Sequence, residues 1–302
     1  MIIGFGVEEG SMISIMGKWR LEHHHSFRRS VTGLFKVDDH HRAFERWDDD
    51  HIKLLEAEFS RFKNAVVLRA THPWERDARM AHHVINKGHP LNILVEIACT
   101  RFSEDLLGAR KAYQSLFASS LEEDVAFHLQ GDQRNLLVGL VSAYRYEGPH
   151  VDDKVAEAEA KVLTHAIKNA ASHHPLHSRE VLRILTTRSR LHLIAVCKHY
   201  EQLNGKSILE DAGVESGLLE TIECLCDSPK YFTSVIEAAL KEGADENAKE
   251  GLTRVVVTRA DFDMKEIKEE YHRRHGVAIE EDIKKSVRGN YRDFLLTLVA
   301  RG

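Results

Sequence analysis

The stretch LTRVVVTRADFDMKEIKEEY (residues 252–271) combines an apolar run, a Thr-Arg pair and a charged, helix-patterned segment that ends in Tyr. The same order recurs in ILVEIACTRFSEDLLGARKAY (93–113) and in VLRILTTRSRLHLIAVCKHY (181–200). A layout that recurs along one chain is the sequence signature of a repeat architecture. The chain is therefore predicted to be a repeat protein.

The apolar run Val255–Val257 could belong to a strand, because it is β-branched and short runs cannot be assigned by periodicity alone. Its surroundings favour a helix. Apolar residues recur at helical spacing from Met264 to Tyr271, and Gly276 is placed to end that helix. We therefore predict that Val255–Val257 is part of a buried helix.

The Thr-Arg pairs end at Arg101, Arg188 and Arg259, and together with Leu-rich segments they indicate a period of about 75 residues, hence four units. Units of this kind cannot bury their apolar faces alone and must pack on one another. The segment EGPHVDDKV (147–155) combines Gly, Pro and acids. It predicts a linker that separates the first two units from the last two.

The composition bounds the class of protein. The chain has 302 residues, with 42 Lys and Arg against 47 Asp and Glu, which argues against bulk binding to nucleic acid. No apolar stretch approaches the ~20 residues of a membrane span, and the first residues do not resemble a signal peptide. Four scattered cysteines do not form a disulfide framework, so a reducing, cytoplasmic location is expected.

Several segments resemble the annexin family, and specifically the plant annexins. The resemblance covers nearly the whole chain, and it is carried by ILVEIACTR, LEEDVAFHLQGDQRNLLVGLVSAYRYEG (121–148), VLRILTTRS and LTRVVVTRADFDMKEIKEEYHRRHGV. It implies an all-α fold: a right-handed superhelix of four annexin repeats of about five helices each. Only MII precedes the loop GFGVEE, so the first repeat is expected to lack most of its first helix. The expected repeats are 1–70, 71–147, 148–227 and 228–302.

The resemblance also implies Ca²⁺ as the cofactor and a calcium loop at the start of the chain. Ca²⁺ takes about six to eight oxygen ligands, and glycines let loop carbonyls turn toward an ion. In the family pattern the carbonyls of Ile2, Gly4 and Gly6 would be ligands, with the carboxylate of Glu58 as the distant acid. Glu56 is the alternative acid, because an insert in this region leaves the register of the alignment open by one residue.

The other repeats are expected to bind calcium weakly or not at all. In the fourth repeat the loop LKEGADEN (240–247) departs from the family pattern, and the distant acid position falls on Ser286. A neutral hydroxyl cannot replace a bidentate carboxylate. The second and third repeats show no such loop, so we predict at most one or two bound Ca²⁺ ions.

Charged residues inside apolar runs predict buried ion pairs, because a buried charge is tolerated only when it is paired. By annexin positions, Asp77 would pair with Arg101, and Glu96 with Arg259 across the halves of the molecule. These pairs could fix the packing of the repeats, or they could line a hydrophilic channel. The first interpretation is preferred.

Cysteines and short motifs give further alternatives. Cys99 and Cys224 match cysteines that some plant annexins place together as a redox pair, although buried free thiols are the commoner explanation. Lys18 occupies the position of a histidine to which peroxidase activity has been credited in relatives. Leu182-Arg183-Ile184 resembles an actin-contact motif ascribed to plant annexins, although a buried helix explains it equally well.

The function that the sequence predicts best is calcium-dependent, peripheral and reversible binding to acidic phospholipid, without enzymatic turnover. The main alternative is a calcium-independent scaffold of helical repeats that pairs with other annexins. F-actin is a further candidate partner, and a redox enzyme is the weakest alternative.

Overall fold

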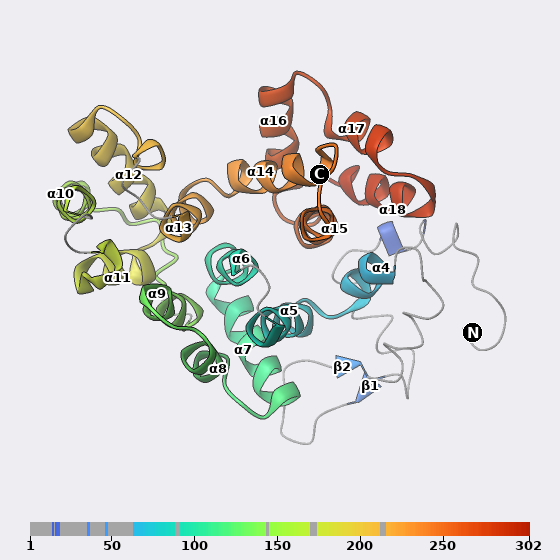
Figure 1. The fold of residues 1–302 in the computed structure, drawn as a ribbon, viewed down its shortest axis with the longest axis horizontal. Helices are drawn as coiled ribbons and strands as arrows, with labels where there is room; N and C mark the ends of the chain where they lie inside the picture. The colour runs from blue at the N-terminus through green and yellow to red at the C-terminus, as the bar shows by residue number, and fades with distance from the viewer. Residues whose placement is uncertain are drawn as a thin grey trace. The chain divides into compact units, whose positions relative to one another are not determined.

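A computed structural model describes residues 63–87, 91–142, 145–169, 174–211 and 216–302, together with residues 14, 16–18, 35–36 and 46–47. The prediction of an all-α protein is confirmed (Figure 1). The exceptions among the described residues are two short strands, β1 (Phe35–Lys36) and β2 (Arg46–Trp47). They pair antiparallel, with Phe35 opposite Trp47.

The helices follow one another in three similar sets after α4 (Lys63–Ala70). The first set is α5 (Pro73–Lys87), α6 (Asn92–Thr100), α7 (Ser103–Phe117), α8 (Leu121–His128) and α9 (Asp132–Val141). The second is α10 (Asp153–Lys168), a 3-10 turn (Pro175–His177), α11 (Arg179–Thr187), α12 (Arg190–Asn204), a 3-10 turn (Ile208–Glu210) and α13 (Ser216–Cys226). The third is α14 (Ser228–Leu240), α15 (Glu246–Arg259), α16 (Met264–His275), α17 (Ile279–Ser286) and α18 (Gly289–Val299).

The chain forms two compact units, but the linker that the sequence suggested does not separate them. One unit contains Met1–Pro73 and Pro229–Gly302, and the other contains Trp74–Ser228. The segment 147–155 therefore lies inside the second unit, where α9 packs against α11 across it. Gly, Pro and acids mark a turn in the backbone, and the apolar faces on both sides of that turn still pack together.

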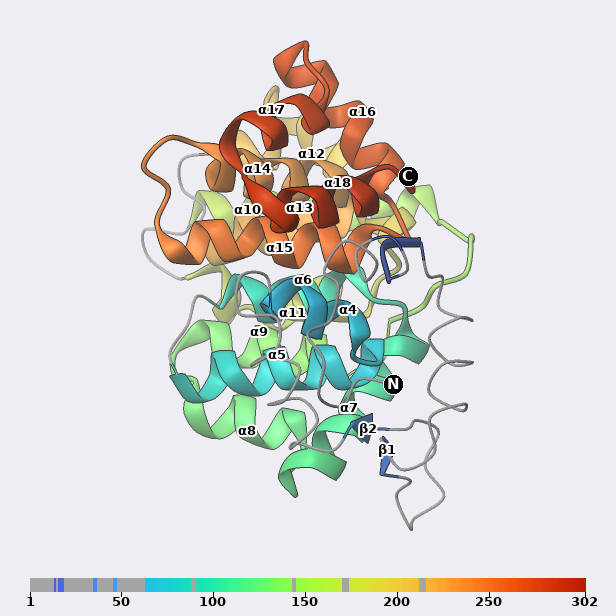
Figure 2. The same ribbon diagram turned by 90° about the vertical axis from the view of Figure 1, so that its right-hand side faces the viewer.

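In the first unit, α4 packs with helices from the last part of the chain. Helix α4 packs beside α15, about 180 residues further along the sequence (Figures 1 and 2). Asp261, in the turn after α15, accepts a hydrogen bond from Arg69 of α4 and forms an ion pair with Arg301, each at 2.6 Å. Arg69 is almost fully buried, so this carboxylate stabilises the packing of α4.

Helix α15 shows that the apolar run 255–257 is helical and buried, as predicted. The Asp245 side chain caps the helix by accepting a hydrogen bond from the Ala248 N–H at 2.7 Å. Val255, Val256 and Val257 are at most 1% exposed. Burial against neighbouring helices outweighs the weak preference of valine for strands.

The tyrosine that closes each repeated stretch has the same structural role three times. Each hydroxyl donates a hydrogen bond to an aspartate eleven residues later, near the next helix: Tyr113 to Asp124 at 2.6 Å, Tyr200 to Asp211 at 2.9 Å and Tyr271 to Asp282 at 2.9 Å. Burial, followed by these hydrogen bonds, raises the pKa of each tyrosine. The tyrosine is thus a buried link between consecutive helices of a repeat.

Left-handed residues end the helices that carry these tyrosines. Gly205 ends α12 and Gly276 ends α16, each with φ of 70°. Helix α7 ends instead on Ala118, which has φ of 57°. Only glycine adopts this conformation without a steric cost, so Ala118 is a strained variant of the same helix end.

Candidate functional site

The predicted calcium ligands Ile2, Gly4, Gly6 and Glu58 lie outside the described residues, as does the alternative Glu56. This site therefore stays a prediction. The structure does describe two corresponding regions of the later repeats, the α14–α15 loop and the α10–α11 connection from residue 174 onward. Both can be compared with the ligands that Ca²⁺ requires.

The α14–α15 loop lies against the end of α17, as the sequence predicted for a calcium loop and its distant acid. The Ser286 hydroxyl donates to the Leu240 carbonyl at 3.5 Å, and Gly243 turns the loop with φ of 77°. Loop and helix end enclose a pocket of about 630 Å³, which we name the α14–α17 pocket. It is lined by Ala239, Leu240, Lys241, Glu242, Gly243, Ala244, Lys249, Leu252, Lys285, Ser286, Val287, Arg288 and Tyr291.

The charges of the α14–α17 pocket are the reverse of those of a calcium site. Its lining contains four basic side chains and one acid, Glu242. Two of the basic groups are partly neutralised, since Lys249 pairs with Glu246 at 2.9 Å and Lys285 with Asp282 at 2.8 Å. Ca²⁺ requires several oxygen ligands and negative charge. This set of residues does not fit Ca²⁺, and it suits an anion instead.

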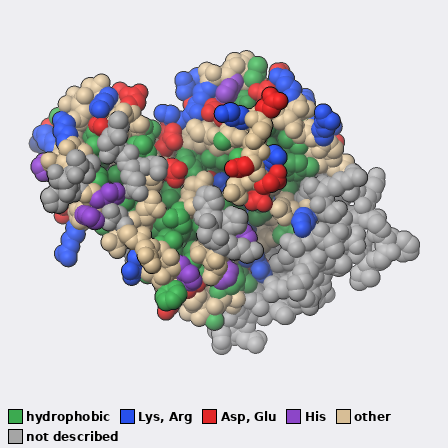
Figure 3. Space-filling view, in the orientation of Figure 1, with side chains coloured by type: hydrophobic (Ala, Val, Ile, Leu, Met, Phe, Trp, Pro, Cys, Tyr) green, Lys and Arg blue, Asp and Glu red, His purple; other side chains and the backbone are tan. Residues whose placement is uncertain are grey.

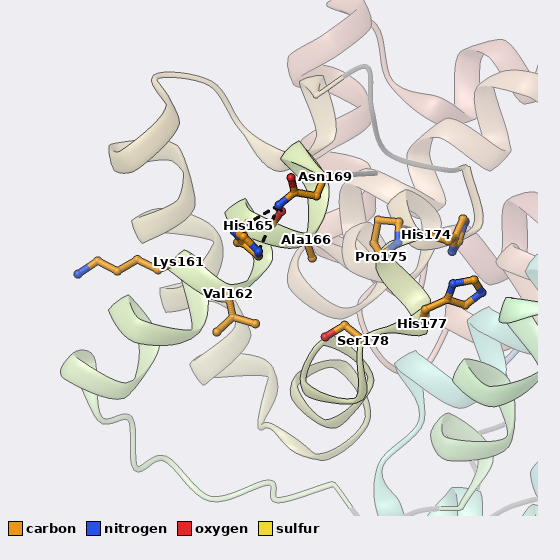
Figure 4. Close-up of a pocket in the computed structure, with 9 residues that line it drawn as sticks. All are labelled: Lys161, Val162, His165, Ala166, Asn169, His174, Pro175, His177 and Ser178. Carbon is orange, nitrogen blue, oxygen red and sulfur yellow. Dashed lines mark hydrogen bonds between the residues drawn. The ribbon is translucent and has the colours of Figure 1, made fainter. Parts of the chain in front are cut away.

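The α10–α11 connection forms a second pocket, of about 820 Å³ (Figure 4). Its lining presents histidine imidazoles and no carboxylate. His165, His174 and His177 line it, and the Asn169 amide contacts the His165 ring at 3.2 Å and donates to the His165 carbonyl at 2.8 Å. Histidine side chains are exposed over this part of the face in Figure 3. Calcium prefers oxygen to imidazole ligands.

The described part of the chain offers no metal site made of such side chains. Within residues 63–302, apart from the gaps in the described ranges, no three His, Cys, Asp or Glu side chains are grouped so that they could hold a metal ion. Across the same residues, no helix is both long enough and apolar enough to cross a membrane.

The predicted pairing of Asp77 with Arg101 is present. Arg101 donates from Nε to Asp77 Oδ2 at 2.5 Å and from Nη2 to Oδ1 at 2.9 Å, a bidentate geometry. The two side chains are 2% and 8% exposed. Burial lowers the pKa of Arg101, but the charge of Asp77 outweighs it and the pKa is raised overall. This pair joins α5 to the end of α6.

The equivalent arginine of the next repeat, Arg188, binds an acid that the sequence analysis missed. Glu159 of α10 accepts from Arg188 at 2.6 Å and from Arg183 at 2.8 Å, and its other oxygen is 2.8 Å from His192 Nε2. Burial would raise the pKa of Glu159, but the hydrogen bonds from these three side chains hold it below its ordinary value. The signal available in the sequence was the Thr-Arg pair itself, which required an acid.

Arg259 has a carboxylate partner within its own unit. It donates to Asp263 at 2.7 Å from Nε and at 2.6 Å from Nη2, and its guanidinium lies 4.9 Å from the centre of the Phe232 ring. Glu96 belongs to the other unit. Its pairing with Arg259 and a channel between the halves both stay predictions, and Arg259 does not depend on Glu96 alone.

The remaining predicted residues lie mostly in structural positions. Cys99 and Cys224 are buried, and burial raises the pKa of Cys99 to about 12 and that of Cys224 well above its ordinary value. In Leu182-Arg183-Ile184, Ile184 is fully buried and Arg183 is paired with Glu159. Lys18 is exposed. The cysteine thiols that do contact each other are Cys197 and Cys226, at 3.4 Å.

Comparison with known proteins matches both the sequence and the fold. The sequence model of the annexin family matches residues 76–140 and 231–298. Annexin D4 of Arabidopsis thaliana is 48% identical and the match covers 99% of this chain and 94% of that protein. Annexin Gh1 of Gossypium hirsutum is 38% identical, over 98% of this chain and 90% of its own.

Solved structures match nearly the whole chain as well. Chicken annexin V in complex with Zn²⁺ has a TM-score of 0.81 at 24% identity, covering 99% of this chain and 91% of that one. Calcium-bound annexin (Sm)1 has a TM-score of 0.78 at 20% identity, covering 99% and 86%. The repeated helices, their shared tyrosine and arginine contacts and the similarity to relatives over nearly the full length agree, and this chain belongs to the annexin family.

Proposed function

We propose that this annexin binds anionic phospholipid peripherally and reversibly, with calcium held mainly by the first repeat. Calcium-dependent binding to phospholipid is the general function of annexins, and annexins are generally non-enzymatic. The observation that carries the finer proposal is the α14–α17 pocket, where Ser286 stands at the position expected for the distant acid and basic side chains predominate. Calcium binding is then left to the carbonyls of Ile2, Gly4 and Gly6 with Glu58.

The α14–α17 pocket would contribute to membrane binding without calcium. Lys241 and Arg288 line it, and neither forms an ion pair with another described residue. Guanidinium and ammonium groups bind phosphate oxygens directly. A basic residue close to an anionic membrane surface contributes about 1 kcal/mol to binding. This pocket would therefore contact lipid phosphate where a calcium ion would otherwise bridge the loop and the lipid.

Vesicle co-sedimentation tests the calcium part of the proposal. Vesicles of phosphatidylserine and phosphatidylcholine are pelleted with the full chain in calcium and in chelator. Calcium should increase the bound fraction, and Glu58→Gln should remove most of that increase because a neutral amide is a weak ligand for calcium.

Glu56→Gln is the matched control, since it removes the same charge two positions away. If Glu56→Gln alone removed the calcium effect, Glu56 would be the acid ligand. If calcium did not increase binding of the unmodified chain, the proposal would fail, and the scaffold that pairs with other annexins would become the better explanation.

The chelator arm tests the pocket separately. Lys241→Ala with Arg288→Ala should weaken calcium-free binding by roughly thirtyfold, because each of the two charges contributes about 1 kcal/mol. The control is Lys265→Ala with Arg292→Ala, which removes two charges from the same unit outside the pocket lining. Equal losses in the two double variants would show that net charge, and not the pocket, governs this binding.

A further inference from the structure

The four cysteines of the chain lie on three helices that pack together in the second unit. Cys99 is on α6, Cys197 is on α12, and Cys224 and Cys226 are on α13. Helix α13 packs against both α6 and α12. Residues far apart in the sequence are thus gathered around one helix. The four thiols differ in their exposure to solvent and in their distance from one another.

One pair of thiols is both close and accessible. The sulfur atoms of Cys197 and Cys226 are 3.4 Å apart, and both side chains are half-buried. Cys99 and Cys224 are at most 1% exposed. A disulfide bond is about 2.05 Å long, so the Cys197 and Cys226 sulfurs need to approach by little more than an ångström to form one.

Two arginines give the surroundings of this pair a positive charge. Arg190 donates to the Leu225 carbonyl at 3.1 Å and to Ser228 Oγ at 2.9 Å. These two acceptors precede and follow Cys226 in the sequence, so the guanidinium is held beside the end of α13. Arg145 is held by the carbonyls of Arg188 and Leu185 at 2.5 and 2.6 Å. Positive groups near a thiol favour the thiolate, which is its reactive form.

The two thiols have different roles in such a pair. The hydrogen bond with Cys197, followed by burial, raises the pKa of Cys226 well above its ordinary value, although Arg190 and Arg145 act in the opposite direction. Either thiol can donate in this contact, and a protonated Cys226 can give its proton toward the Cys197 sulfur. This arrangement suits an attacking sulfur at Cys197 and a second, resolving thiol at Cys226.

We propose that Cys197 and Cys226 form an oxidisable dithiol that reacts with a hydroperoxide and closes to an intramolecular disulfide between α12 and α13. The Cys197 thiolate attacks the O–O bond, a sulfur–oxygen bond forms, and the alcohol or water leaves with a proton, which makes a sulfenic acid. The Cys226 sulfur then attacks the Cys197 sulfur, and the oxygen leaves as water with the Cys226 proton. Two thiols lose two electrons in total, and the peroxide gains them.

The experiment uses hydrogen peroxide on the folded full chain, followed by alkylation of the remaining thiols in denaturant and mass spectrometry of the peptides. Two of the four thiols should disappear, and the cross-linked peptides should join Cys197 to the α13 peptide. Cys224 and Cys226 share that peptide, so Cys224→Ser is needed to assign the link. The disulfide should persist in Cys224→Ser and in Cys99→Ser.

The single variants distinguish the two roles. Cys226→Ser should leave a sulfenic acid on Cys197 that a dimedone reagent traps, whereas Cys197→Ser should leave Cys226 largely unmodified. Serine is nearly isosteric with cysteine, and an unchanged circular dichroism melt confirms that each variant is folded. A link between Cys99 and Cys224, four unmodified thiols after treatment, or first reaction at Cys226 would overturn the proposal.

Discussion

Replacing Glu159 by Gln removes one buried negative charge while keeping the length of the side chain. In the folded protein this carboxylate binds Arg188 at 2.6 Å, Arg183 at 2.8 Å and His192 at 2.8 Å. These contacts join α10 to α11 and to the first turn of α12. Gln can accept from one partner, but it carries no charge and its amide nitrogen faces donors.

The expected loss of stability is about 2–3 kcal/mol. A hydrogen bond to a charged group contributes about 1.5–3 kcal/mol, and such values are not additive. The side chains of Arg188 and Arg183 are 34% and 40% exposed, so both can turn toward water when the carboxylate is lost. His192 is 6% exposed and cannot. The total is therefore well below the sum of three charged hydrogen bonds.

The assay is urea unfolding of the full chain at a series of pH values, with the loss of helix monitored by circular dichroism. The pKa of Glu159 is lower in the folded chain than in the unfolded chain. The stability that the charged carboxylate contributes is therefore fully present above the unfolded pKa of about 4.3. It is lost as the pH falls through the lower, folded pKa. The difference between the protein and Glu159→Gln should be largest near neutral pH and should narrow below about pH 4.5.

Glu157→Gln is the matched control, because it is the same change two residues away on α10. Glu157 is 47% exposed, and its ion-pair partner among the described residues is Lys161, one turn further on. Its loss should not change the unfolding midpoint measurably, since exposed pairs of this kind contribute little. If Glu159→Gln behaved like Glu157→Gln, or if its deficit were constant with pH, the reasoning about the buried cluster would be refuted.

Three further predictions concern the repeated helices and the calcium sites. Tyr271→Phe should reduce stability by about 1–2 kcal/mol in denaturant unfolding, because Asp282 loses a buried donor; an unchanged midpoint would contradict this. Ala118→Gly should raise stability by about 0.5–1 kcal/mol, because glycine relieves the left-handed backbone there, whereas Gly205→Ala should lower it in the same assay. Isothermal titration in the presence of vesicles should count at most about two Ca²⁺ ions per chain, and four well-resolved sites would show that the later repeats bind calcium after all.

The sequence predicted the helices well where a physical pattern repeats. Thr-Arg followed by a helix ending in Tyr marked α7, α12 and α16 correctly, because buried faces recur at the helical period. The same pattern also predicted the Asp77–Arg101 pair through the resemblance to annexins. It was less informative about boundaries: the segment 147–155 looked like a division of the chain, yet it lies inside a compact unit.

Partners that come from distant parts of the chain could not be read in the same way. The contact between the Cys197 and Cys226 sulfurs was not predicted, and the Cys99–Cys224 pair that the resemblance suggested stays a prediction. A spacing of 29 residues gives no indication of contact, because it depends on the rotation of α13 against α12. The acid for Arg188 was missed for the same reason, since Glu159 precedes it by 29 residues and sits among alanines.

The sequence by itself determined that this protein is a helical repeat protein, that its apolar runs are buried and that Ser286 stands where the annexin pattern expects a distant acid, since these depend on local periodicity and on the identity of single residues. Only the tertiary structure decided which arginine meets which carboxylate, which thiols are adjacent, and that basic side chains surround Ser286. Those contacts depend on how helices rotate and pack against one another, and the free energy of packing is a property of the assembled unit that no single segment encodes.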